Sequence, residues 1–297
     1  MVEDIIQCEN LVKIYKTKDL EVLALQGLEI NIAKGELMAI IGNSGSGKST
    51  FLNMIGGLDR PSAGRLIVDG KDLFKLNERE LVEYKRSTVG FVWQNNARNL
   101  VPYLTASQNV QLPMIFGNVK TRSDRAQELL ELVGMAHKKD NKLSQLSGGE
   151  QQRIAIAIAL ANNPKILLAD EPTGSVDAKT GDYILDVFRE LNHSGMTVVV
   201  VTHDRMLSKK MNRVVTIRDG KTSSEMILKQ SYAERLDAIG LQDEPHNEYA
   251  VLDKAGRVQL PKEYLETLGV KGNRVSVAME NGRIVIGAPE AEHNSPQ

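Results

Sequence analysis

The sequence predicts an α/β fold with a parallel β-sheet at its core. An antiparallel β platform, a helical subdomain and a small, mainly β carboxy-terminal domain complete the expected architecture. Apolar, strand-like runs at 37–41, 89–93, 166–169 and 198–201 alternate with segments of helical periodicity, and this alternation is typical of parallel sheets. A glycine-rich loop also follows the first run and opens a helix, which is the arrangement of phosphate-binding loops.

The platform and the helical subdomain are predicted from the segments that flank these strands. Before the first core strand, β-rich stretches at 11–15, 22–25 and 28–32 alternate with turns, which is typical of antiparallel strands. Between 105 and 162 the chain instead has helical periodicity. We therefore expect a helical subdomain inserted between two core strands.

Length and composition limit the classes of protein that fit. The chain has 297 residues, enough for one large and one small domain or for two medium ones. Its formal net charge of −1 argues against a broad nucleic-acid-coating surface, and its single cysteine, Cys8, fits a reducing compartment. No run approaches the roughly 20 apolar residues that cross a bilayer, and the amino terminus lacks a signal-peptide pattern. A cytoplasmic location is therefore expected.

The glycine-rich loop is the strongest functional signal in the sequence. It consists of Gly42, Asn43, Ser44, Gly45, Ser46, Gly47, Lys48, Ser49 and Thr50. Glycines let the backbone wrap a phosphate closely, so that successive amides point into the loop at a helix start. In this pattern Lys48 reaches the β- and γ-phosphates, and the hydroxyl of Ser49 is placed to bind Mg²⁺. The sequence therefore predicts a nucleoside triphosphate site.

The other core strands each lead to polar residues. Gln94 follows the second strand, Asp170 and Glu171 follow the third, and His203 lies just after the fourth. Because ligands of open parallel sheets bind at the carboxyl ends of the strands, these residues are expected to converge. Asp170 suits a carboxylate that holds Mg²⁺ opposite Ser49, and Glu171 suits a general base for the attacking water. A structural role for a buried Asp-Glu pair is the alternative.

A second anion-binding pattern precedes the helical run 152–161. Ser147, Gly148 and Gly149 stand at the expected helix start, where backbone N–H groups favour an anion. Because the first loop already cradles one nucleotide, the second pattern is best explained by the γ-phosphate of a nucleotide held by another subunit. An ordinary serine-capped helix is the alternative.

With these motifs in this order, the chain resembles ATP-binding cassette (ABC) ATPases over about residues 3–225. The resemblance implies a P-loop, RecA-like core that uses ATP and Mg²⁺. The stretches 90–94, 104–106 and 171–177 resemble the lipoprotein-release and macrolide-export branch of that family. The family's signature motif corresponds to residues 146–151, and in it Glu150 replaces a frequent glutamine.

The resemblance also implies roles for individual residues. Tyr15 stands where the family stacks an aromatic ring on adenine, although an ordinary strand tyrosine is the alternative. Gln94 would sense Mg²⁺ and the attacking water. His203 would contact the γ-phosphate and orient Glu171, and Asp177 would lie at the contact between two ATPase subunits.

The same resemblance implies a cytoplasmic subunit on the inner face of the cell membrane. Two copies would enclose two ATP molecules and drive an integral membrane permease on a separate chain. The alternative is a soluble ABC-type protein with a DNA-binding or regulatory carboxy-terminal domain. Relatives that act on nucleic acid need coiled-coil insertions, zinc-binding cysteines or a second cassette, and the sequence has none of these.

The expected domain boundaries follow from changes in pattern along the chain. The ABC ATPase domain is expected over 1–225, and a linker with a helix near 232–239 over 226–248. A compact pattern over 249–288 forms the carboxy-terminal domain, and 289–297 is a tail.

Residues 249–288 resemble the swapped-hairpin family of AbrB-like and MazE-like proteins. The resemblance rests on 253–261, 268–272 and 281–286, the last opening with Asn-Gly, a strong hairpin signal. It implies dimerisation by intertwining, because about 40 residues rarely bury a core alone. From 246 to 297, three Lys and three Arg stand against six Glu and one Asp. This balance favours dimerisation, and DNA binding is the alternative.

Overall fold

Two units make up the protein. The computed structural model describes residues 3–16, 20–94, 100–116, 122–174, 176–204, 208, 210–228, 246–252, 256–270, 275–280 and 282–288. Contacts divide the chain into a first unit, 1–249, and a second unit, 250–297. The first contains the large sheet and its helices, and the second contains a helix and a hairpin.

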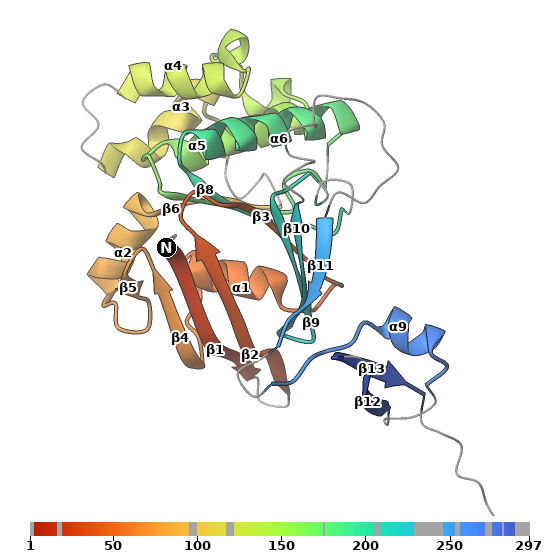
Figure 1. Ribbon diagram of the computed structural model, residues 1–297. Coiled ribbons are helices and arrows are strands. Elements are labelled where there is room, and N and C mark those ends of the chain that lie inside the picture. The colour runs from red at the N-terminus through yellow and green to blue at the C-terminus, as the bar shows by residue number, and fades with distance from the viewer. Residues whose placement is uncertain are drawn as a thin grey trace, which may run out of the picture. The chain divides into compact units, whose positions relative to one another are not determined.

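A seven-stranded sheet forms the centre of the first unit (Figure 1). Its strand order is β11-β10-β9-β3-β8-β7-β6. The strands are β3 (Leu37–Ile41), β6 (Val89–Val92), β7 (Ile166–Asp170), β8 (Thr197–Val201), β9 (Arg213–Arg218), β10 (Lys221–Leu228) and β11 (His246–Ala250). The strands from β6 to β9 in this order run parallel, and β10 pairs antiparallel with β9. The predicted parallel sheet is confirmed, and its four predicted strands are neighbours.

The predicted antiparallel platform is also confirmed. Its strands are β1 (Asp4–Lys16), β2 (Glu21–Ala33), β4 (Ala63–Val68) and β5 (Lys71–Asp72), in the order β2-β1-β4-β5. Where the sequence indicated two separate stretches, β2 is one continuous strand. Gly27 lies opposite a register shift between Leu11 and Val12 and has φ +85°, so it is absorbed as a bulge rather than as a turn.

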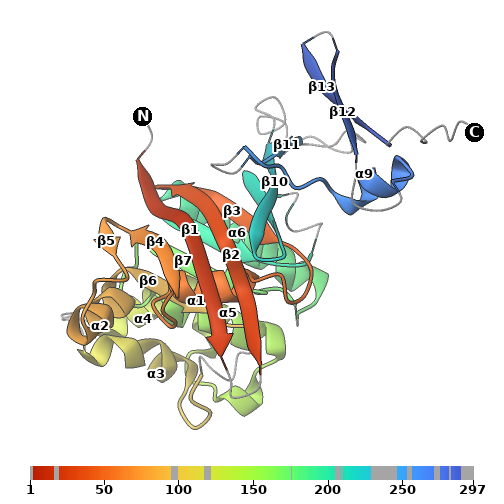
Figure 2. The ribbon, with the colours of Figure 1, turned by 90° about the horizontal axis from the view of Figure 1, so that it is seen from below.

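Helices cover both faces of the parallel sheet. The described helices of the first unit are α1 (Lys48–Ile55), α2 (Glu78–Ser87), α3 (Ala106–Gln111), α4 (Arg122–Leu132), α5 (Gly148–Leu160) and α6 (Ala178–His193), with short 3₁₀ turns η2 (Leu112–Phe116), η3 (Ala136–Lys138) and η4 (Leu143–Gln145). The predicted helical subdomain corresponds to α3, α4 and α5. Figure 2 shows β1 and β2 of the platform in front, with α1 and the parallel sheet behind them.

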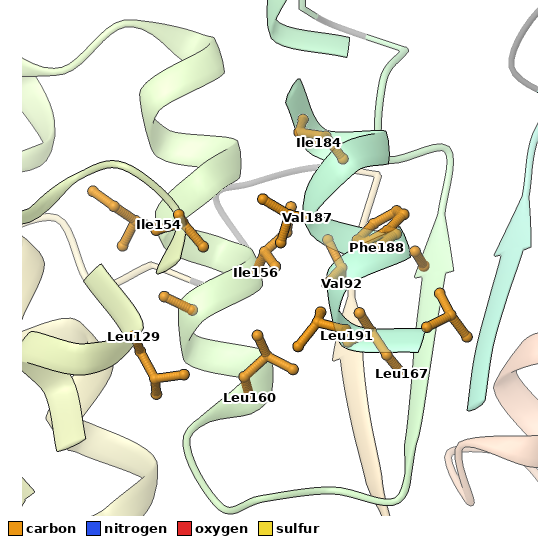
Figure 3. Close-up of a cluster of buried hydrophobic side chains, with 14 of the residues drawn as sticks. Val92, Leu129, Ile154, Ile156, Leu160, Leu167, Ile184, Val187, Phe188 and Leu191 are labelled. Atoms are coloured by element: carbon orange, nitrogen blue, oxygen red, sulfur yellow. The ribbon is translucent and has the colours of Figure 1, made fainter. Parts of the chain in front are cut away.

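Alternate residues of the central strands point to opposite faces and build two hydrophobic cores. In β8, Val198 and Val200 join the cluster formed with α3 to α6, part of which Figure 3 shows. Val199 and Val201 join the cluster formed with α1 and the platform. All four side chains are fully buried. Strands buried on both faces read as continuous apolar runs, which explains why the sequence located them.

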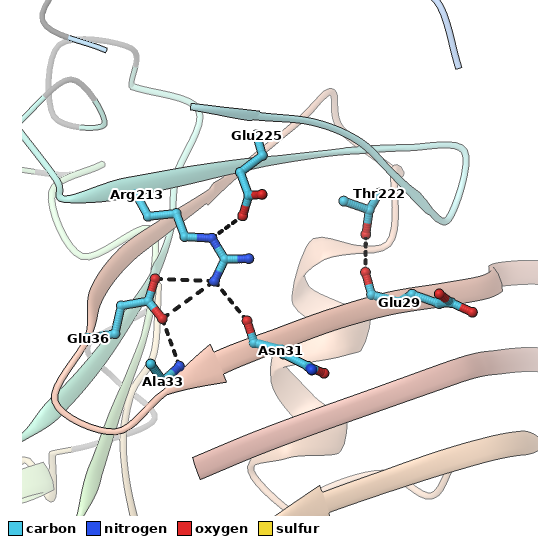
Figure 4. Close-up of polar contacts among 7 residues, drawn as sticks. All are labelled: Glu29, Asn31, Ala33, Glu36, Arg213, Thr222 and Glu225. Carbon is cyan, nitrogen blue, oxygen red and sulfur yellow. Dashed lines mark hydrogen bonds and ion pairs between the residues drawn. The ribbon is translucent and has the colours of Figure 1, made fainter. Parts of the chain in front are cut away.

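An ionic cluster around Arg213 ties the platform to the parallel sheet (Figure 4). Arg213 begins β9, and its Nη1 donates to the backbone oxygen of Asn31 over 2.8 Å. The same nitrogen lies 3.2 Å from Oε1 of Glu36, while Nε donates to Glu225. The three charged side chains are only 14% to 23% exposed. One guanidinium therefore joins strands that are distant in sequence.

The second unit contains α9 (Lys262–Thr267) and the antiparallel pair β12 (Ser276–Glu280) and β13 (Arg283–Gly287). Gly282 in the connecting turn has φ +75°, and Asn281 lies outside the described residues. Every residue of β12 is exposed, including Val277 and Met279. Among the described residues of this unit, no hydrophobic side chain belongs to either core cluster.

In the part of the chain that the structure describes, no helix is long and apolar enough to cross a membrane. The helix expected near 232–239 and the tail 289–297 lie outside that part. The boundaries expected for the linker and for the AbrB-like domain stay predictions.

We expect Arg213→Ala to lower the free energy of unfolding by about 1–3 kcal/mol, because it leaves Glu36 and Glu225 half-buried without their shared cation. Urea denaturation followed by circular dichroism measures the change. Arg60→Ala is a matched control, since Arg60 pairs with Glu78 in solvent and such pairs contribute about 0–1 kcal/mol. Equal losses for the two variants would contradict the role given to the cluster.

Candidate functional site

The predicted site residues lie at the carboxyl edge of the parallel sheet. The phosphate loop follows β3, Gln94 follows β6, Asp170 ends β7, and His203 follows β8. In the parallel pairing of β7 with β8, Asp170 is the register partner of Val201. Backbone pairing therefore brings the ends of these strands together, as the sequence predicted.

The phosphate loop needs glycine at two positions for reasons that the structure makes specific. Gly47 has φ +102° and immediately precedes α1, and a Cβ there would lie 2.6 Å from the backbone oxygen of Ala24. A Cβ on Gly42 would collide with the backbone oxygen of Ile217. The loop is thus pressed against β2 and β9, which fixes its shape before any ligand binds.

Lys48 folds back over the loop. Its Nζ donates to the backbone oxygens of Gly42 over 2.9 Å and of Asn43 over 3.0 Å, and the residue is only 8% exposed. Burial lowers the pKa of the Lys48 ammonium, although the carboxylates of Glu171 and Asp170 act in the opposite direction. The ammonium is therefore held over the loop by acceptors that an anionic ligand can replace.

The loop also holds a buried polar atom that fits a phosphate cradle. The Oγ of Ser46 is buried and has no hydrogen-bond partner among the described residues. Of the other predicted loop residues, Ser44, Gly45 and Ser49 are exposed, and Thr50 is partly buried in the first turn of α1. A loop of backbone N–H groups suits phosphate oxygens, and the Ser46 hydroxyl can donate one further hydrogen bond to them.

Ser49 and Asp170 meet as predicted. Ser49 Oγ donates to Asp170 Oδ1 over 3.1 Å, and Asp170 is 8% exposed. The described residues contain no cluster of three or more His, Cys, Asp or Glu side chains that could hold a metal. One carboxylate and one hydroxyl suit Mg²⁺, which keeps waters and takes its other ligands from substrate phosphates.

Glu171 is held in a strained backbone conformation beside this pair. Its φ is +49°, which costs roughly 1–2 kcal/mol for a residue with a Cβ. His203 contacts both carboxylate oxygens: its Nδ1 lies 2.9 Å from Oε1, and its backbone N–H donates to Oε2 over 3.3 Å. The Glu171 side chain is 11% exposed, whereas that of His203 is 72% exposed. Glu171 is therefore fixed in direction, next to Asp170 in the chain.

The signature begins α5, as predicted. Ser147 caps the helix: its Oγ accepts from the N–H of Glu150, and its own N–H donates to Glu150 Oε2 over 2.8 Å. Lys138 reaches Oε1 of the same carboxylate over 2.6 Å. These hydrogen bonds hold the pKa of Glu150 at about 2. The acid that replaces the frequent glutamine is thus neutralised by Lys138, a residue that the sequence did not single out.

Asp177 has a local role that the sequence did not predict. It caps α6: Oδ1 accepts from the N–H of Thr180 over 3.0 Å, and Oδ2 accepts from its hydroxyl over 2.7 Å. These hydrogen bonds lower the pKa of the Asp177 carboxyl. A Cβ on Gly149 would lie 2.9 Å from Cγ2 of the same threonine. Thr180 therefore joins the signature to the start of α6.

Two predicted residues, Gln94 and Tyr15, lie at the surface. Gln94 is exposed just beyond β6, next to Trp93, whose ring packs on Phe91 at 4.1 Å between centroids. Tyr15 lies on β1 and is 39% exposed. Its hydroxyl donates to Asp59 Oδ2 over 2.7 Å. Asp59 was not predicted, because nothing in its local sequence marks it as a site residue.

Comparison with known proteins gives consistent results. A family model described as ABC transporter matches residues 25–174. An ABC transporter ATP-binding protein of Thermotoga maritima is 48% identical over 211 residues, which are 70% of this chain and 89% of the relative.

Solved structures agree with the sequence matches. The chain is 43% identical to MJ0796, with TM-scores of 0.71 for the dimeric cassette and 0.70 for its dimeric post-hydrolysis state bound to ADP and Pi. Each match covers 75% of this chain and 99% of the other. CbiO1 of Clostridium perfringens is 29% identical with a TM-score of 0.69, covering 78% of this chain and 92% of the other.

These matches span nearly the whole of each relative, and the phosphate loop and strand-end residues described above lie in the same chain. The protein belongs to the ABC transporter family, as one of its ATP-hydrolysing ATP-binding proteins.

Proposed function

We propose that this ATPase is the cytoplasmic subunit of an ABC-type transport or mechanotransmission complex and acts on a separate membrane permease. Its cofactors are ATP and Mg²⁺. The observation that carries the ATP-hydrolysing part of the proposal is the strand-end group in which Ser49 meets Asp170 and Glu171 meets His203. Such a group can hold a metal–triphosphate and direct one water at it.

The chemistry follows from what each side chain can do. Lys48 exchanges its loop carbonyls for the β- and γ-phosphates. Ser49 and Asp170 would hold Mg²⁺ together with Gln94, and the ion supplies charge neutralisation for phosphoryl transfer. Glu171 accepts the proton of the attacking water, and His203 keeps the carboxylate aimed.

The active form would be a dimer that shares its sites. Ser147, Gly148 and Gly149 of one chain would close the γ-phosphate site of the other, and Asp177 would lie at their contact. Two features support this: the signature is a second helix start suited to an anion, and MJ0796 forms a dimer in its ADP and Pi complex.

A permease on a separate chain is the partner proposed. The solved relative CbiO1 is part of the ABC transporter complex CbiONQ, and this chain has no described membrane-spanning helix. The motif resemblance of residues 171–177 favours the lipoprotein-release and macrolide-export branch. Peripheral association with the inner face of the membrane follows from such a partner.

The second unit would hold two ATPase subunits together. Its β12–β13 hairpin exposes Val277, Met279 and Ile284 by 65%, 71% and 68%. A two-stranded hairpin is marginal alone in water, so these side chains need a covering surface. A second copy of the same hairpin supplies one of matching character, as in AbrB-like dimers. DNA binding by this unit is the rival function.

We expect Glu171→Gln to bind ATP but to lower turnover by roughly 10²–10⁴-fold, because the general base is lost. Steady-state phosphate release measures turnover, and size-exclusion chromatography with ATP should show a trapped dimer. Glu190→Gln, on the exposed part of α6, is the control and should stay near wild type. Wild-type turnover in the Glu171→Gln variant would show that Glu171 is not the general base.

The signature is expected to act in trans. Lys48→Ala weakens nucleotide binding and Ser147→Arg blocks the signature, so each variant alone should be inactive. After subunit exchange, a mixed dimer has one of its two sites with both halves intact and should regain part of the wild-type activity, at most about half. Absence of any recovery, with exchange confirmed by labelled subunits, would count against a shared site.

Truncation after Ala250, which keeps β11, should leave a folded ATPase that is monomeric without nucleotide. Full-length protein should be dimeric, because its second units pair. This pairing tethers the two cassettes and raises the effective concentration of each near the other to roughly millimolar. Light scattering gives both masses, and Met279→Glu should act like the truncation, whereas Val82→Glu on α2 should not.

A full-length protein that is monomeric without nucleotide would contradict the proposal that the second unit holds two ATPase subunits together. Duplex-DNA shift assays on the full-length and truncated proteins, repeated across salt concentrations, test the rival function. Tight, sequence-selective binding that disappears on truncation would favour DNA binding.

A further inference from the structure

Tyr15 is held by two residues outside the phosphate loop and the signature, Lys13 and Asp59. Its hydroxyl donates to Asp59 Oδ2 over 2.7 Å, and the ammonium of Lys13 lies 4.7 Å from the ring centroid. The ring is therefore fixed at its polar end and covered on one side.

Asp59 is itself firmly held. Its Oδ1 accepts from Nζ of Lys13 over 2.5 Å and from the N–H of Arg60 over 2.8 Å. The same Lys13 ammonium donates to the backbone oxygen of Arg60 over 2.8 Å. Partial burial would raise the pKa of the Asp59 carboxyl, but the hydrogen bonds from Lys13 and Tyr15 hold it below its ordinary value. Asp59 is thus an ionised acceptor with little freedom to turn.

This arrangement leaves one ring face for a ligand. Because the Lys13 ammonium occupies one side of the Tyr15 ring, a stacked base can use only the other. A fixed ring also spares the binding step the cost of ordering a side chain. The cation over the ring would moreover draw electron density away from the face that receives an electron-rich purine.

Asp59 also ties the ring to the part of the chain that follows the phosphate loop. It lies in the segment that leaves α1, the helix that the loop opens. That segment is bound to β1, since the N–H of Ser62 donates to the backbone oxygen of Val12 over 2.8 Å. The ring is therefore held, through Asp59, against the segment that follows α1.

We propose that Asp59 and Lys13 are positioning residues that hold the Tyr15 ring ready to stack on the adenine of ATP. The proposal rests on the proposed function and on the adenine contact that the family resemblance implies for Tyr15. Asp59 and Lys13 would act on the affinity for the nucleoside part and leave the phosphates and the chemical step to the strand-end residues. If the two residues only held β1 against the segment after α1, their loss would affect the binding of the nucleoside part and of the phosphates alike.

The test compares ATP with tripolyphosphate, a probe that has the phosphates and no base. We expect Asp59→Ala and Tyr15→Phe each to raise the Kd and the KM for ATP by roughly 3- to 10-fold, the usual effect of one hydrogen bond. The inhibition constant of tripolyphosphate and kcat at saturating ATP should change less than about twofold. Asp59→Asn, which keeps an acceptor for the phenol, should recover part of the loss.

A double-variant cycle tests whether Asp59 acts through the phenol. If it does, Tyr15→Phe combined with Asp59→Ala should weaken ATP binding no more than either change alone. Asp72→Ala is the matched control: Asp72 has a similar exposure to Asp59 and also pairs with a lysine. It should leave the Kd for ATP unchanged. Thermal midpoints show whether each variant is folded.

Failure of the inference and failure of the proposed function give different results. Tyr15→Ala should raise the Kd for ATP by roughly 5- to 100-fold, the range for loss of one base stack. If it does not, the adenine contact itself is wrong. If it does, but Asp59→Ala leaves ATP binding intact, weakens tripolyphosphate equally, or lowers kcat at unchanged KM, then the positioning role is overturned.

Discussion

The double-sided burial of β3, β7 and β8 is the constraint on which the rest of the molecule depends. Strands with both faces covered can satisfy their backbone groups only through their neighbours, so the register of each strand is fixed. Because β7 pairs residue by residue with β8, Asp170 and Glu171 lie beside the chain that leads to His203. The convergence of the strand-end residues is thus a consequence of sheet pairing.

The same constraint explains what the sequence could predict. Continuous apolar runs located the core strands, and the polar residue after each run located the candidate catalytic residues. Glycines in a fixed spacing identified the phosphate loop. By contrast, the contacts of Asp59 with Lys13 and Tyr15 join residues that are 44 to 46 positions apart. No local pattern records such a contact, since it exists only once β1 and the segment after α1 are packed together.

Other differences from the sequence prediction have similar causes. Gly27 interrupts the β pattern, yet the strand continues because a bulge absorbs the extra residue. The strain at Glu171 is also invisible in sequence. The strained conformation is maintained because the N–H of Glu171 donates to the backbone oxygen of Val201 over 2.8 Å and the Glu171 carboxylate is held by His203. Strain of this kind, over-determined by its surroundings, is common at functional sites.

Thr180 gives a physical route for communication within the subunit. Its hydroxyl is bound to Asp177, and its methyl leaves no room for a side chain at Gly149. Displacement of the first turn of α6 would therefore push directly on the first turn of α5. In a dimer of the proposed kind, Asp177 and the signature of one chain would face different parts of the interface. Opening of the dimer interface at one nucleotide would then alter the site of the other nucleotide. The two hydrolysis events would be cooperative rather than independent.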